Sequence, residues 1–146
     1  MNIKQTAGTL LIIVVLIIGT AGIAQRKGPD ASEQTEFSAE DSAVKNPVPV
    51  PADVLNILRK DDLVRNILED QKIPAEQMPA SWFSASAIHL SSPKREDLVV
   101  VAEGPLAGGN VVTFWVFCAT PRGYELVLMA PAHDLEVKNT RWKGHR

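Results

Sequence analysis

The chain has 146 residues and a formal net charge of −2, so it is long enough for one domain at most once its tails are set aside. A net charge so close to zero gives no positive field that would attract a polyanion, which argues against nucleic acid as a partner. Cys118 is the only cysteine, so an internal disulfide is excluded. The fold must therefore be held together by its apolar core.

The N-terminal region has the three parts of a secretory signal. Lys4 precedes an uncharged apolar run over residues 7–24. Gly22 and Ala24 then occupy the small-residue positions that signal peptidase reads, directly before Gln25. This pattern predicts a removable signal peptide over residues 1–24 and an exported protein, periplasmic or extracellular.

A membrane anchor is the alternative interpretation of the same segment. The apolar run is about the minimum length for a span, and Arg26 and Lys27 directly after it fit the flank of an anchor. In that case we expect a single-pass membrane protein whose C-terminal domain lies outside the cytoplasm. Membrane contact is expected only through residues 7–24.

The composition of residues 25–51 predicts a disordered acidic and proline-rich linker. The stretch 28–43 is acidic, small and polar with one aromatic residue, Phe37, and such a composition buries too little apolar surface to offset the entropy of ordering. Prolines then alternate with valines up to Pro51, which makes a stiff extended spacer. We interpret this spacer as a tether rather than as a ligand for a proline-binding groove.

A helical pattern follows over residues 52–72, "ADVLNILRKDDLVRNILEDQK". Apolar residues recur at the i, i+3, i+4 spacing of an amphipathic helix in two groups, and the stripe slips at "RKDD" between them. The pattern allows one helix with a drifting face, or two short helices with Asp61 or Asp62 capping the second.

The remainder of the chain alternates apolar segments with turn signals. Strands are expected at 85–90, 97–103, 111–119, 124–130 and 134–138, and Gly123 supplies the positive φ that the "PRG" turn needs. We therefore predict an α+β domain over residues 52–146, with one or two helices packed on a four- or five-stranded antiparallel meander.

The strand at 111–119 should be central, since it is apolar on both faces. Val112, Phe114, Val116 and Cys118 project to one side, and Thr113, Trp115 and Phe117 project to the other. One helix layer covers a single face, so the other face needs the segment at Trp82–Phe83, curling of the sheet, or a partner. We expect an interaction surface at Trp115, Phe117 and Trp142 and a buried Cys118.

The segment 97–146 resembles part of an uncharacterised exported bacterial domain, in which a leader and a variable linker precede a small β-rich unit. The matching stretches are "GGNVVTFWVF", "GYELVL" and "RWKGH". The resemblance covers about the last third of the chain and implies no catalytic residues.

Motifs for chemistry are missing from the sequence. His89, His133 and His145 lie in no zinc-binding pattern, the serines lack a GxSxG elbow, and "GPLAGGN" lacks the lysine of a phosphate loop. We predict no catalytic, cofactor-binding or metal-binding residues. The sequence favours a non-enzymatic domain that binds a protein or envelope component, or a second copy of itself; a cell-envelope hydrolase is the alternative.

Overall fold

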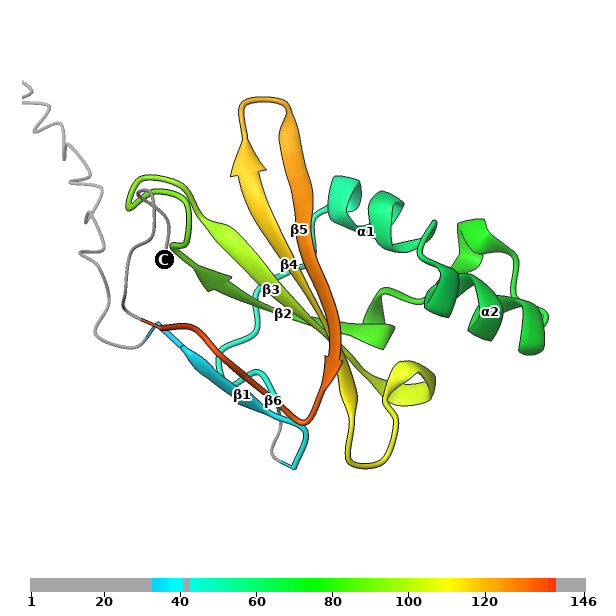
Figure 1. Ribbon diagram of the computed structural model, residues 1–146. Coiled ribbons are helices and arrows are strands. Elements are labelled where there is room, and N and C mark those ends of the chain that lie inside the picture. The colour runs from blue at the N-terminus through cyan, green and yellow to red at the C-terminus, as the bar shows by residue number, and fades with distance from the viewer. Residues whose placement is uncertain (1–32, 41–42, 139–146) are drawn as a thin grey trace, which may run out of the picture. The chain divides into compact units, whose positions relative to one another are not determined.

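The computed structural model describes residues 33–40 and 43–138 (Figure 1). Residues Ala31–Arg146 form a compact unit of their own. The expected leader and Trp142 lie outside the described residues. In the part of the chain that is described, no helix has both the length and the apolar character needed to cross a bilayer.

The helical region forms two short helices, α1 (Ala52–Leu58) and α2 (Asp62–Asp70). The second of the two expected arrangements is therefore the one observed. Asp61 is the N-cap of α2, and its Oδ1 accepts a hydrogen bond of 2.9 Å from the backbone N–H of Leu63. The apolar stripe buries Val54 and Leu58 on α1, and Val64 and Leu68 on α2.

Four strands follow in the expected meander: β2 (Phe83–Ile88), β3 (Asp97–Ala102), β4 (Val112–Thr120) and β5 (Gly123–Ala132). They form one antiparallel sheet in the order β2-β3-β4-β5. Short 3₁₀ helices lie at Ala75–Gln77, Ala80–Trp82 and Gly104–Leu106. The prediction of an α+β domain with helices on an antiparallel meander is confirmed.

The prediction of a disordered linker is wrong for residues 33–40 and 43–51. Strand β1 (Glu36–Ser38) pairs antiparallel with β6 (Asp134–Glu136) in a separate two-stranded sheet. Further along, the backbone N–H of Val48 donates to the carbonyl oxygen of Ala85. The folded domain therefore begins before Ala52, and the last expected strand of the meander leaves the main sheet to pair with β1.

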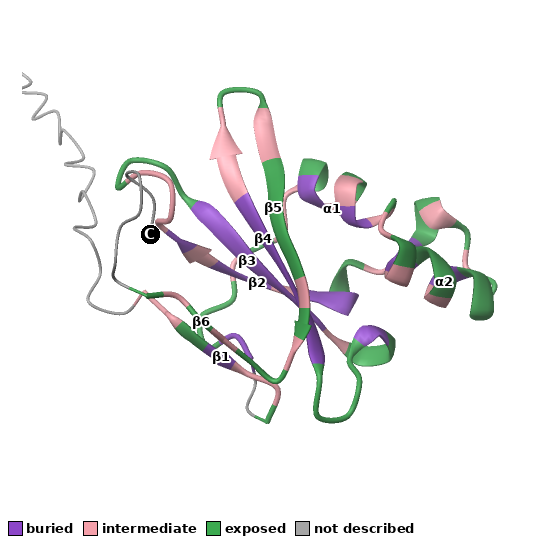
Figure 2. Cartoon of the chain, viewed as in Figure 1, coloured by how far each residue is buried: buried purple, intermediate pink, exposed green. Residues whose placement is uncertain are grey.

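The helices and the β1–β6 pair lie on opposite faces of the four-stranded sheet (Figures 1 and 2). The indole N–H of Trp115 donates to Oδ2 of Asp61, the N-cap of α2, at 3.1 Å. The preceding residue of β4, Phe114, contacts the ring of Phe37 from β1 edge-on, with 6.5 Å between ring centroids. Because neighbours in a strand point to opposite faces, α1 and α2 cover one face and the β1 segment covers the other.

Candidate interaction surface at the edge of the sheet

Two of the residues expected to form an interaction surface belong to the core. Trp115 and Phe117 are both 0% exposed. Trp115 is enclosed by Phe83, whose ring lies edge-on at a centroid distance of 5.8 Å, and its indole N–H is satisfied by Asp61. The prediction was wrong because Trp115 lies on the face that the helices and Phe83 cover, while the N-terminal segment covers the opposite face.

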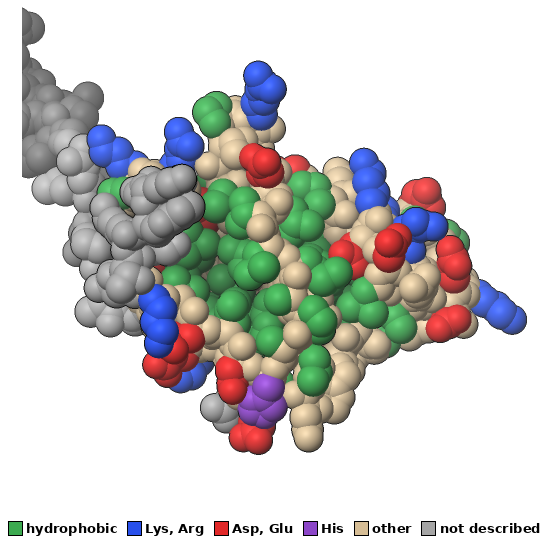
Figure 3. All heavy atoms as spheres, in the orientation of Figure 1, with side chains coloured by type: hydrophobic (Ala, Val, Ile, Leu, Met, Phe, Trp, Pro, Cys, Tyr) green, Lys and Arg blue, Asp and Glu red, His purple; other side chains and the backbone are tan. Residues whose placement is uncertain are grey.

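The exposed apolar residues lie instead on β5. Leu126, Val127, Leu128 and Met129 are 37%, 53%, 45% and 45% exposed, and Figure 3 shows hydrophobic side chains gathered over this part of the sheet. Successive side chains in a strand alternate between the two faces. Exposure of four in a row therefore means that β5 is uncovered on both faces here.

The backbone of β5 is also open along its outer side. Within the described residues β5 pairs only with β4, and no backbone hydrogen bond reaches Leu126–Ala130 from any element other than β4. At one end the N–H of Tyr124 donates to Asp53 Oδ2 at 3.2 Å, and at the other Pro131 has no N–H to donate. The open stretch Leu126–Ala130, called the β5 edge below, is about 17 Å long at ~3.4 Å per residue.

A β-bulge lies within the β5 edge. Val116 is opposite Leu128 and Phe117 is opposite Leu126, so Val127 is the extra residue. A bulge locally disrupts the ladder and re-aims a side chain. Val127 is accordingly the most exposed apolar side chain of the strand.

A groove of about 690 Å³ runs beside the β5 edge, between the β4–β5 hairpin and the residues that follow β6. Its apolar lining includes Val116, Leu128, Leu135 and Val137. Cys118 also lines the groove and is only partly buried, which corrects the expectation that it is fully buried. Burial raises the pKa of the Cys118 thiol, with further contributions from Asp97 and Glu125, so the less reactive protonated form is favoured.

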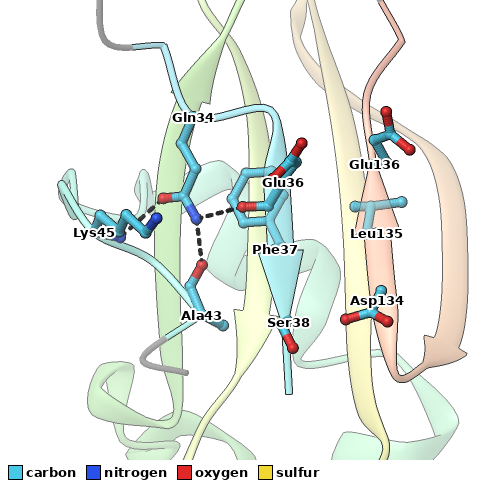
Figure 4. A pocket seen from close by; sticks show the side chains of 9 residues that line it. All are labelled: Gln34, Glu36, Phe37, Ser38, Ala43, Lys45, Asp134, Leu135 and Glu136. Atoms are coloured by element: carbon cyan, nitrogen blue, oxygen red, sulfur yellow. Dashed lines mark hydrogen bonds between the residues drawn. The ribbon is translucent and has the colours of Figure 1, made fainter. Parts of the chain in front are cut away.

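A smaller cavity of about 340 Å³ lies between β1, β6 and residues 43–45 (Figure 4). Gln34 organises it: its amide nitrogen donates to the carbonyl oxygens of Glu36 and Ala43, and its amide oxygen accepts from the N–H of Lys45. These bonds explain why the N-terminal segment folds back on itself. In the described chain no three His, Cys, Asp or Glu side chains are grouped to hold a metal ion.

His133 lies where β5 passes into β6, outside both cavities. Its Nδ1 is 2.8 Å from Asp134 Oδ2 and its Nε2 is 3.5 Å from Glu40 Oε1. The hydrogen bond with Asp134 is the main reason that the pKa of His133 is raised. His89 is 3.9 Å from Glu33, and His145 lies outside the described residues. These contacts join surface segments.

Comparisons with protein-family models, with curated proteins and with solved structures gave no match. The surface must therefore be interpreted from its own geometry. This surface was not predicted from the sequence, although one signal was present: β5 is the last long apolar run of the meander, and its Pro131 is typical of an edge strand.

Proposed function

We propose that this protein is an exported or membrane-tethered, non-enzymatic domain that binds another polypeptide by strand addition at the β5 edge. One observation carries the proposal: an open backbone edge coincides with four consecutive exposed apolar side chains. Natural edge strands are normally protected by charged side chains, prolines or covering segments. Here Asp53 and Pro131 protect only the ends, and Leu126–Ala130 carries no charge.

Strand addition would use both the open backbone and the exposed apolar side chains of the β5 edge. The backbone groups of an incoming strand provide affinity, and its alternate side chains select the partner through the surfaces on either face. On one face those side chains would enter the groove lined by Val116, Leu128 and Val137. The bound species is therefore expected to be an extended, largely apolar polypeptide segment.

Site-specific photocross-linking in the native envelope tests the proposal. A cross-linking amino acid at Val127 should give a specific protein adduct. The same residue at Val111, which is similarly exposed at 48% but lies outside β5, should not. Met129→Pro removes a backbone donor from the edge and should abolish the adduct. Equal adducts at positions 127 and 111, or an adduct at 127 that is unchanged by Met129→Pro, would contradict binding at this edge.

Export is tested separately by N-terminal sequencing of the protein from fractionated cells. If residues 1–24 are a cleaved leader, the mature chain begins at Gln25. An uncleaved chain in the membrane fraction supports the anchor, with the domain accessible to protease from outside the cytoplasm. Protection from external protease in both forms would contradict export.

A further inference from the structure

We infer that the strand added at the β5 edge is β5 of a second copy of this chain, antiparallel across a two-fold axis, so that two four-stranded sheets become one. This inference rests on the proposed function and names its partner. A two-fold interface needs a surface that is complementary to itself. The length, the charge and the faces of β5 each meet this condition.

The length of the open edge limits which strand can pair with it. The carboxylate of Asp53 occupies the N–H of Tyr124 at one end, and Pro131 provides no donor at the other. A long regular strand would extend past both ends of the open stretch and lose hydrogen bonds there. A second β5 has an open stretch of the same length with the same two ends. In an antiparallel pair centred between Val127 and Leu128, the open stretch of each copy faces that of the other.

The charge of β5 favours the antiparallel arrangement. Glu125 is the only charged residue in Gly123–Ala132. With Val127 facing Leu128 of the second copy, Glu125 lies opposite Ala130, so no like charges meet. A parallel in-register pair would place the two Glu125 side chains opposite each other, which is destabilising. The net charge of −2 adds little repulsion between whole molecules.

The two faces of the edge give the pair its driving force. Leu126, Val127, Leu128 and Met129 are exposed across both faces, and a symmetric pair brings the same side chains of two copies together on each. The bulge at Val127 interrupts a regular ladder. We therefore expect a weak dimer whose population depends on protein concentration.

Sedimentation of the compact unit Ala31–Arg146 tests the inference with a matched pair of variants. The unmodified chain should pass from monomer to dimer as its concentration rises. Val127→Lys places a charge in the centre of the edge and should shift the dissociation constant by at least tenfold. Val111→Lys makes the same chemical change at a similarly exposed site outside β5 and should leave the equilibrium unchanged.

Disulfide trapping tests the geometry. In a Cys118→Ala background, Val127→Cys lies close to the two-fold axis and should give a covalent dimer under mild oxidation, while Val111→Cys should stay monomeric. A chain that remains monomeric at all concentrations, or a dimer that persists in Val127→Lys, would overturn the inference. A protein adduct of different mass at Val127 in the envelope would then leave the proposed function standing with another partner.

Discussion

Asp61 connects a helix to the sheet through a single carboxylate. Its Oδ1 caps α2 at the N–H groups of Leu63 and Val64, and its Oδ2 accepts from the buried indole of Trp115. The position of α2 on the sheet is therefore fixed by a polar contact as well as by apolar packing.

Removing this carboxylate should be costly. Asp61→Ala loses a helix cap, worth about 1 kcal/mol, and leaves the indole N–H of Trp115 buried without a partner, worth about 1–3 kcal/mol. We expect a loss of roughly 3 kcal/mol in the free energy of unfolding, measured with urea. Asp61→Asn keeps one acceptor oxygen, which can serve the helix cap or the indole but not both, so it should lose less than Asp61→Ala. Equal losses in the two variants would show that the shared contact contributes little.

The contact between His133 and Asp134 should depend on pH. The raised pKa of His133 means that its contribution is complete below the ordinary histidine pKa of about 6.5 and is lost as pH rises through the raised value. The hydrogen bond from His133 also lowers the pKa of Asp134, so that contribution is present above about pH 4 and is lost as pH falls through the lowered value. The contact is strongest between these limits.

An NMR titration of the His133 ring measures this directly. We expect a midpoint above 6.5 in the unmodified protein and a lower midpoint in Asp134→Asn. A midpoint that does not move in Asp134→Asn would mean that Glu40 or the solvent, rather than Asp134, determines the protonation of this ring.

At the scale of elements, the β1–β6 pair contains a destabilising contact. Glu36 lies directly opposite Glu136, and like charges at facing positions repel. Glu136 is partly compensated by its ion pair with Lys138. The pair is held mainly by its backbone bonds, by Phe37 and by the hydrogen bonds of Gln34.

Reversing one of these charges should stabilise the pair. Glu36→Lys replaces repulsion by attraction and should raise the free energy of unfolding by about 0.5 kcal/mol, with Glu36→Gln intermediate. Glu136→Lys provides the control, since it also breaks the ion pair with Lys138 and should give a smaller gain or none. Thermal unfolding at low and high salt measures both effects, and similar gains from the two lysine variants would argue against this account.

The elements that could be predicted from the sequence are those fixed by local interactions. The start of α2 follows from Asp61 and from apolar spacing within a few residues, and the β4–β5 hairpin follows from "PRG" with φ of 114° at Gly123. Strand β1 could not be predicted, because it is three residues long, its composition is acidic, and its partner β6 lies near the other end of the sequence.

The interaction surface was missed for a related reason. Composition shows that a strand is apolar but does not show which strand forms the edge of a sheet. Once β6 pairs with β1 instead of β5, β5 becomes the edge and its side chains are exposed. The same pairing buries Phe114 under Phe37. The pairing of β1 with β6 therefore determines both that Phe114 is covered and that the β5 edge is open.

At the scale of the whole molecule, the N-terminal segment should be required for a stable domain. A chain that begins at Ala52 loses Phe37, Ala43 and Val44, which are all buried. Burial of an aromatic side chain alone contributes a few kcal/mol. We expect this chain to bind a hydrophobic dye and to unfold at a lower temperature than Ala31–Arg146. If the shorter chain unfolds at the same temperature, the segment 33–51 adds nothing to stability.

The antiparallel pairing of β1 with β6 also determines how the domain would respond to mechanical force. The carbonyl oxygen of Thr35 accepts from the N–H of Val137, so the chain enters and leaves the domain at the same end of this pair. Tension between the two ends of the chain would open the pair one hydrogen bond at a time, which requires less force than sliding the strands past each other. Because Phe37 lies on β1, the first step would uncover Phe114, while the four-stranded sheet would still carry no load. A pulling force on the two ends of the chain would therefore open the two-stranded β1–β6 sheet before the four-stranded sheet.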